Sequence, residues 1–212
     1  MTFAQDERQR LCDTALEAGA DAPTLCEGWT VADLVAHLHA RENDPVGALS
    51  LAVPALKDVA TRRRNELITR YGFAGLVEQV ANGPKRTSLF GLPGVDEKAN
   101  GLELYVHHED IRRAADPVPA PRDLGPAIEN DLWSKLAMAR MALRKAPVGV
   151  VLERSDVAGQ TRRAKGGTRT VTVVGLPSEL ILYVFGRRSA ANVKLIGDPD
   201  SLAALESAQV GV

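Results

Sequence analysis

The chain has 212 residues, of which 45% are hydrophobic and 25% charged, and its formal net charge is −1. This composition is typical of a soluble globular protein. It excludes a disordered chain and argues against a general nucleic-acid binder, which would carry a basic excess. No apolar run approaches the ~20 residues that span a bilayer, so no membrane partner is expected. The polar first residues and the two cysteines, Cys12 and Cys26, predict a cytoplasmic protein with reduced thiols.

Helical periodicity dominates roughly the first two thirds of the chain. The apolar spacing predicts helices over residues 3–18, 31–42, 46–68, 73–80, 101–114 and 128–146. Thr30 and Asp33 should cap the second helix as a capping box. Pro54 should kink or break the third helix, and Tyr71-Gly72 should end it. The long loop at 82–94 is rich in breakers with an apolar centre, and we expect it to form the mouth of a functional pocket.

Short β-branched runs replace the helical pattern after Pro147. They predict strands at 148–152, 169–174 and 193–196, and helices at 179–185 and from Asp198-Pro199 onward. Lys165-Gly-Gly167 should form a hairpin turn, and Ser178 should cap the first of these two helices. We therefore expect an α+β protein that is mainly α, with a helical domain at 1–146 and a small α+β domain at 147–212.

The helix predicted at 101–114 carries Glu103 four residues before His107, a spacing that lets both side chains bind one metal ion. Helical phasing places both beside Leu104 and Ile111, so they should point inward. It places three charged residues on the opposite side: Glu109, Arg112 and Arg113. A buried carboxylate needs a partner, and an ion pair or a hydrogen-bonded Glu/His pair meets that need as well as a metal does. The residues alone leave both interpretations open.

The four histidines of the chain fall into two pairs, His37/His39 and His107/His108. The first pair lies in the helix predicted at 31–42, which could supply a third ligand from a neighbouring helix. Helical phasing leaves each of the two at an edge of the apolar stripe and does not choose between them. The alternative is that both are ordinary edge histidines on a surface helix.

Two segments carry a resemblance to a known family: Leu25-Cys-Glu-Gly-Trp-Thr-Val-Ala-Asp-Leu-Val-Ala-His37-Leu and Glu103-Leu-Tyr-Val-His107-His-Glu-Asp-Ile-Arg-Arg-Ala114. They resemble the metal-binding domain of the mycothiol-dependent maleylpyruvate isomerase family, within the DinB-like superfamily. The resemblance implies a DinB-like four-helix up-down bundle before the small α+β domain. It also implies one divalent metal ion, expected to be zinc, held by His37, Glu103 and His107, and so favours His37 over His39. The segment Gly186-Arg187-Arg188 resembles a Gly-Arg segment of the family, which implies that Arg187 faces the active cavity.

Two imidazoles and one carboxylate leave a coordination position open, as in catalytic rather than structural metal sites. The resemblance implies that a low-molecular-weight thiol such as mycothiol binds there and adds to a small electrophile, giving isomerisation or S-transfer. Hydrolysis by metal-bound water is the competing chemistry. A metal-binding protein without catalysis and an interaction module are the alternatives to an enzyme. A homodimer is expected from similar helical proteins, although no sequence feature marks its interface.

Four residues near these segments have separate interpretations. Asp110 and Asp33 could each accept a hydrogen bond from a ligand imidazole, but Asp33 serves equally well as a cap residue. His108 is interpreted as a residue outside the ligand set. Cys26 precedes the second predicted helix with no evident base nearby, which favours an inert thiol.

Overall fold

The computed structural model describes residues 2–44, 54–85, 88 and 95–208. The chain divides into two compact units, Met1–Pro119 and Ala120–Val212, and mainly helical α+β architecture is confirmed. Among the helices of these residues, none combines the length and hydropathy that a membrane span requires.

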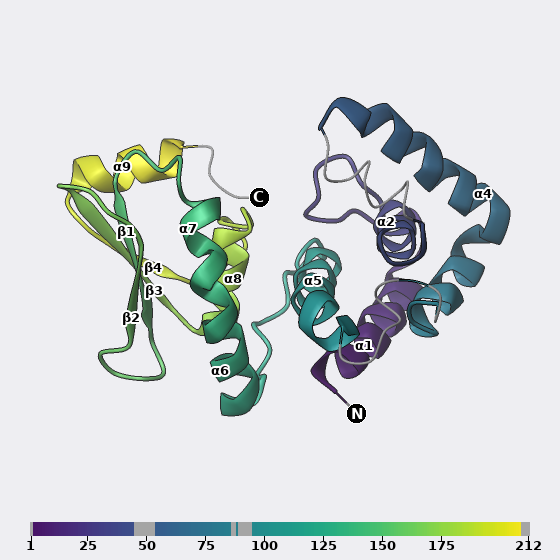
Figure 1. Ribbon diagram of the computed structural model, residues 1–212, viewed down its shortest axis with the longest axis horizontal. Coiled ribbons are helices and arrows are strands. Elements are labelled where there is room, and N and C mark those ends of the chain that lie inside the picture. Colours follow the sequence, from purple (N-terminus) through teal and green to yellow (C-terminus); the bar gives the residue numbers. More distant parts are fainter. Residues whose placement is uncertain (1, 45–53, 86–87, 89–94, 209–212) are drawn as a thin grey trace. The chain divides into compact units, whose positions relative to one another are not determined.

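The first unit contains four longer helices: α1 (Phe3–Ala18), α2 (Val31–Asn43), α4 (Lys57–Ala81) and α5 (Val95–Arg112). A 3-10 turn at Pro54–Leu56 precedes α4. α1 packs against α5, and α2 packs against α4 (Figure 1). The predicted capping box at the start of α2 is present, because the Thr30 hydroxyl accepts from the Asp33 amide while the Asp33 carboxylate accepts from the Thr30 amide. The part of the predicted third helix before residue 54 and most of the predicted pocket-mouth loop lie outside the described residues.

A kink divides α4. Gly72 has φ 64° and ψ 169°, values outside the helical region, so the helix changes direction there. This left-handed φ favours glycine over any residue with a Cβ, and it confirms the interruption predicted at Tyr71-Gly72.

The core of the first unit is formed by apolar side chains from all four helices, including Leu11, Leu34, Leu76, Leu104 and Ile111. The side of α5 opposite the Glu103/His107 pair is buried as well. Glu109 is 0% exposed and Arg113 is 4% exposed, and Arg113 Nε lies 2.5 Å from Glu109 Oε2. Charged residues therefore lie on this side as predicted, but they form a buried ion pair.

The second unit consists of a four-stranded sheet and short helices. The strands are β1 (Gly149–Arg154), β2 (Thr161–Lys165), β3 (Thr170–Gly175) and β4 (Lys194–Ile196). The helices are α6 (Gly125–Lys135), a 3-10 turn (Leu136–Met138), α7 (Ala139–Ala142), α8 (Pro177–Val184) and α9 (Pro199–Ser207). The strand order is β2-β1-β3-β4, with β1 and β3 parallel and the other pairs antiparallel. α7 packs on β2 and α8 on β3, on the same side of the sheet (Figure 1).

The predicted hairpin turn at Lys165-Gly-Gly167 is wrong. β2 pairs with β1 and not with β3, so the chain crosses the start of β1 between β2 and β3. The backbones of Gly167 and Gly149 approach each other closely at this crossing. A Cβ added to Gly167 would lie only 2.5 Å from the Gly149 amide nitrogen. Gly167 is therefore needed for close backbone approach instead of for a turn.

The predicted Ser178 cap is also wrong. The N-cap of α8 is Leu176, and the carboxylate of Glu129 on α6 accepts hydrogen bonds from the Ser178 amide (2.9 Å) and hydroxyl (2.8 Å). A carboxylate at a helix N-terminus satisfies free amides and complements the helix dipole. This contact joins α6 to α8 within the second unit. The compact units divide after Pro119, whereas the sequence predicted a boundary between residues 146 and 147.

Candidate metal centre

His37 on α2 meets Glu103 and His107 on α5. Glu103 Oε1 lies 3.5 Å from His37 Nε2 and 3.3 Å from His107 Nε2. The two imidazole ring centroids are 5.1 Å apart in an edge-on arrangement. One ligand atom from each of the three side chains can be chosen so that all lie within 4.8 Å of one another. Two helices thus bring the three residues predicted as ligands to one point.

These three side chains are suited to a divalent cation. The side chain of His37 is 11% exposed, that of Glu103 27% and that of His107 10%, so the cluster is shielded but accessible. Both ring nitrogens of His37 are buried and lack a hydrogen-bond partner in the described part of the chain. Buried polar atoms without partners are uncommon and indicate a missing ion or water. Two neutral imidazoles and a carboxylate form a donor set that first-row divalent metals accept.

Asp110 supports His107 from behind. Its Oδ2 lies 2.9 Å from His107 Nδ1, the nitrogen that faces away from Glu103, and Asp110 is 0% exposed. Cys26 donates to the same oxygen at 3.2 Å, and the Leu25 amide donates to the Asp110 carbonyl at 3.0 Å. Metal-binding histidines commonly donate their second N–H to a carboxylate in this way, which fixes the ring orientation. The loop before α2 is therefore anchored to the last turn of α5 beside the centre.

The ring of Trp29, which is partly buried, supports His37, with ring centroids 5.0 Å apart. The guanidinium of Arg64, on α4, lies over the Trp29 ring, 4.7 Å from its centroid. Its Nε also contacts Asp33 Oδ1 at 2.7 Å. Among the described residues, α4 thus reaches His37 through Trp29, and Asp33 contacts Thr30 as a cap residue and Arg64 as an ion-pair partner.

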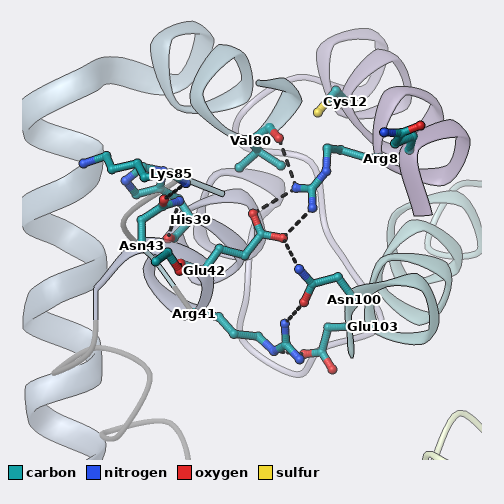
Figure 2. A network of polar contacts seen from close by, with 12 residues as sticks. Arg8, Cys12, His39, Arg41, Glu42, Asn43, Val80, Lys85, Asn100 and Glu103 are labelled. Carbon is teal, nitrogen blue, oxygen red and sulfur yellow. Dashed lines mark hydrogen bonds and ion pairs between the residues drawn. The ribbon is translucent and has the colours of Figure 1, made fainter. Parts of the chain in front are cut away.

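A polar network connects Glu103 to the interior of the helical unit (Figure 2). Arg41 Nε lies 3.5 Å from Glu103 Oε1, and Arg41 Nη1 donates to Asn100 Oδ1. Asn100 donates to Glu42 Oε1 at 3.0 Å, and Arg8 donates to both carboxylate oxygens of Glu42, at 2.7 and 2.9 Å. Arg8 and Glu42 are almost completely buried. The network ties α1, α2 and α5 together next to the candidate centre.

The environment changes the pKa of each of the three clustered groups. Burial raises the pKa of Glu103, but its contacts with the imidazoles of His107 and His37 outweigh burial, so the net pKa is well below the ordinary value. Burial lowers the pKa of His37, and its contact with Glu103 does not compensate. Burial also acts to lower the pKa of His107, yet hydrogen bonds to Asp110, Cys26 and Glu103 raise it well above the ordinary value. In the absence of metal, these shifts favour the charged forms of Glu103 and His107 and the neutral form of His37.

The remaining histidines lie elsewhere. His39 points to the opposite face of α2, where its ring lies 5.6 Å from that of Tyr71 on α4. His108 is buried between α5 and α1, with Nδ1 2.7 Å from Glu7 Oε1 and Nε2 3.0 Å from Thr14 Oγ1. It therefore joins helices outside the cluster, as predicted.

Arg187, the candidate predicted from the C-terminal segment, lies just after α8 in the second unit. Its Nη1 donates to the Phe185 carbonyl at 2.7 Å, and its side chain is partly buried.

Sequence reasoning missed two contacts of the centre. Cys26 was interpreted as a thiol with no base nearby, but it donates to Asp110 and lies 4.0 Å from His107 Nδ1. No spacing rule connects positions 26 and 110, since they come from a loop and a distant helix. Arg41 was not considered, although it lies four residues after His37 and helical phasing puts both on one face of α2.

Comparisons with known proteins agree with this architecture. The sequence model of the mycothiol maleylpyruvate isomerase N-terminal domain matches residues 4–88. Among solved structures, the fold is similar to that of the mycothiol-dependent maleylpyruvate isomerase, with a TM-score of 0.57 and 15% identity over 92% of this chain and 91% of that chain. A histidine-to-alanine mutant of the mycothiol-dependent maleylpyruvate isomerase gives a TM-score of 0.55 and 17% identity over the same shares. No curated protein matches the chain significantly.

The sequence match covers α1, α2 and α4, including His37, while the structural similarity extends through both units. The predicted resemblance is therefore confirmed: residues 4–88 match the model of the mycothiol maleylpyruvate isomerase N-terminal domain, and the fold of the chain is similar to that of the mycothiol-dependent maleylpyruvate isomerase.

Proposed function

We propose that the protein is a metal-dependent enzyme that adds a low-molecular-weight thiol of the mycothiol type to a small electrophile. The reaction would be an isomerisation if the thiol leaves again and an S-transfer if it stays attached. His37, Glu103 and His107 would hold the metal ion, and zinc is the ion that we expect. The observation that carries this proposal is the convergence of two imidazoles and one carboxylate from α2 and α5, with both nitrogens of His37 lacking a hydrogen-bond partner among the described residues. The resemblance supplies the thiol and the reaction class.

The residues of the chain would divide the work as follows. His37, Glu103 and His107 bind the ion and leave a position for thiol or substrate. A divalent ion bound there would supply Lewis acidity, which lowers the pKa of a coordinated thiol and so favours the thiolate at neutral pH. Asp110 holds the His107 ring with Nε2 directed at Glu103. Arg41 contacts the Glu103 carboxylate and donates a hydrogen bond to Asn100, which would hold the guanidinium beside that carboxylate.

We further propose that Arg187 contacts the anionic part of the substrate. The fixed charge and planar geometry of arginine suit carboxylate recognition. Substituting Arg187 with lysine should raise KM for an anionic electrophile while the zinc content stays unchanged. If the lysine variant also lost zinc, this result would contradict a substrate-binding role and would assign Arg187 a structural one.

A second function is favoured by the position of Arg41. Its guanidinium approaches the oxygen of Glu103 that faces both imidazoles, so the cluster would also be stable as a metal-free polar contact between two helices. In that case the protein would be an interaction module without catalysis.

Titration calorimetry separates these functions. Zinc-loaded protein, metal-free protein and zinc-treated Glu103→Gln would each be titrated with mycothiol and with N-acetylcysteine as a simple thiol. Thiol binding that requires both zinc and Glu103, together with thiol-dependent turnover on a panel of α,β-unsaturated carbonyl compounds, supports the enzyme. Zinc binding without thiol binding or turnover contradicts the enzyme and leaves a non-catalytic metal protein. No zinc binding at all leaves the interaction module.

A further inference from the structure

A cavity lies on the face of α2 turned away from the candidate metal centre. It has a volume of about 270 Å³ and is formed between α2, α4 and the residues that follow α4. This volume is slightly below the range of about 300–1,000 Å³ that holds drug-sized ligands, so it fits a small molecule. His39 and Tyr71 contribute aromatic surface, and Leu67 contributes apolar surface. None of these residues belongs to the metal cluster.

His39 is the buried polar group of this cavity. Only 3% of its surface is exposed, and its Nδ1 is buried without a hydrogen-bond partner among the described residues. Each imidazole offers two ring nitrogens for hydrogen bonds. A buried nitrogen without a partner costs free energy, and a polar ligand in the cavity would remove that cost.

The charges around the cavity favour an anion. Three cationic side chains line it, Arg63, Arg70 and Lys85, together with two carboxylates, Asp44 and Glu66. Both carboxylates are engaged by Arg63, whose Nε lies 3.8 Å from Asp44 Oδ2 and whose Nη1 lies 3.3 Å from Glu66 Oε2. Three cations and two carboxylates give the lining a net charge of +1, and the cations other than Arg63 are Arg70 and Lys85.

Neither of these two cations is paired with a carboxylate within the described part of the chain. The Arg70 guanidinium lies over the Tyr71 ring, 5.2 Å from its centroid. Lys85 is held in place through its backbone, since its amide donates to Asn43 Oδ1 at 2.8 Å. Figure 2 shows Lys85, Asn43 and His39 close together and apart from Glu103. Arg70, Lys85 and the His39 imidazole can each donate a hydrogen bond to a phosphate oxygen.

We propose that this cavity is a second ligand site, which binds a small phosphomonoester. Arg70 and Lys85 contact the phosphate, His39 hydrogen-bonds to it, and Tyr71 and Leu67 contact the organic part. The site is independent of the metal centre, so its occupancy does not require zinc.

The test follows the imidazole NMR signals of the full-length protein, which has only four histidines. The His39 signal is assigned with His39→Gln. Phenyl phosphate, inorganic phosphate and benzoate are titrated at low ionic strength into zinc-loaded and into metal-free protein. We expect a saturable shift of the His39 signal in both forms, strongest for phenyl phosphate and weakest for benzoate. Lys85→Gln and Arg70→Gln should each weaken binding about tenfold, the effect of losing one hydrogen bond to a charged group.

Arg62→Gln is the matched control, because Arg62 lies on α4 and makes the same change of charge without lining this cavity. Binding should be unchanged in this variant. Three results overturn the proposal: no saturable shift of the His39 signal, equal weakening in Arg62→Gln and Lys85→Gln, or a shift that disappears when zinc is removed. A response to inorganic phosphate that phenyl phosphate does not strengthen overturns the assignment of an ester, and tighter binding of benzoate overturns the assignment of a dianion.

Discussion

The two faces of α2 carry histidines two residues apart with different surroundings. His37 faces α5, where a carboxylate and a second imidazole lie within reach. His39 faces α4, where it meets Tyr71 and a cavity lined by cations. Burial is the main cause that lowers the pKa of each, so the two imidazoles are alike in protonation. The difference between them lies in what the neighbouring helix supplies, and this determines whether a histidine can bind a metal ion.

The largest effect should come from the ion pair that fixes α2 between its two neighbours. Glu42→Ala leaves the Arg8 guanidinium buried without its carboxylate, and breaking a buried pair in this way costs about 3–5 kcal/mol in the free energy of unfolding. Chemical denaturation monitored by circular dichroism measures this loss. Asp6→Ala is the control, because it removes the exposed pair between Asp6 and Arg10, and exposed pairs contribute at most about 1 kcal/mol. Equal effects of the two substitutions would contradict a structural role for the buried pair.

The sequence predicts the helices of the first unit better than it predicts which histidine of α2 faces α5. Helix positions in the first unit follow from local apolar spacing and from caps such as Thr30 and Asp33. The Glu103/His107 pair follows from helical spacing alone. The choice of His37 over His39 does not, because both lie at an edge of the apolar stripe, and only the resemblance predicted which face meets α5. Contacts between distant segments, such as Cys26 with Asp110, have no local signal.

The second unit shows the same limit of local reasoning. β1, β3 and β4 were predicted from β-branched runs, whereas β2 was not. The strand order was not predicted either, because it depends on which edges meet in space. The glycines at 166–167 have the composition of a hairpin turn, yet the backbone of Gly167 passes close to Gly149 instead. The cap of α8 comes from Glu129, 49 residues earlier in the chain, so no cap signal is visible beside that helix.

A substitution on α5 tests whether the face of α2 that carries His37 binds the metal ion. At a free zinc concentration 100 times Kd, a site that binds only the folded state stabilises it by about 2.7 kcal/mol. Glu103→Ala should abolish this zinc-dependent gain, because it removes the only carboxylate that contacts both imidazoles among the described residues. Thermal unfolding with and without zinc measures the gain. A zinc-dependent rise in Tm that persists in Glu103→Ala would place the metal elsewhere.

A smaller effect is expected behind His107. Asp110→Asn removes the charge that orients the ring while keeping the size of the side chain. Loss of such a supporting partner weakens metal affinity about 10–100-fold. Competition with a chromophoric zinc chelator measures the change, and Asp33→Asn, which alters a carboxylate that contacts no imidazole, is the control. If both variants bind zinc like the wild type, the Asp110 contact does not orient a ligand.

The pH dependence should distinguish His107 from the histidines of α2. The pKa of His107 is raised above the ordinary 6.5. At any pH below this raised pKa, zinc must therefore displace a proton from His107 in order to bind. Zinc affinity should therefore increase by about tenfold per pH unit up to the raised pKa, through this one group, and then level off. The stability of the metal-free protein should change in the opposite direction. Its contribution from His107 is fully present below pH 6.5 and is lost as the pH rises through the raised pKa.

Zinc affinity by chelator competition and metal-free stability by denaturation, both as functions of pH, test this pair of opposite slopes. Asp110→Asn should flatten both, because it removes a hydrogen bond that raises the pKa of His107. Two slopes of the same sign would show that His107 is not the group that exchanges its proton for the metal.

The central claim is that His37, on one face of α2, binds a metal ion and that His39, on the other face, does not. The most direct measurement is the metal content, by elemental analysis, of untagged wild-type protein, His37→Ala and His39→Ala after zinc incubation and removal of excess metal. We predict close to one zinc per chain in the wild type and in His39→Ala, and a loss of zinc in His37→Ala. Equal zinc content in the two variants, or no zinc in the wild type, would contradict the assignment of the metal centre to the α5 face.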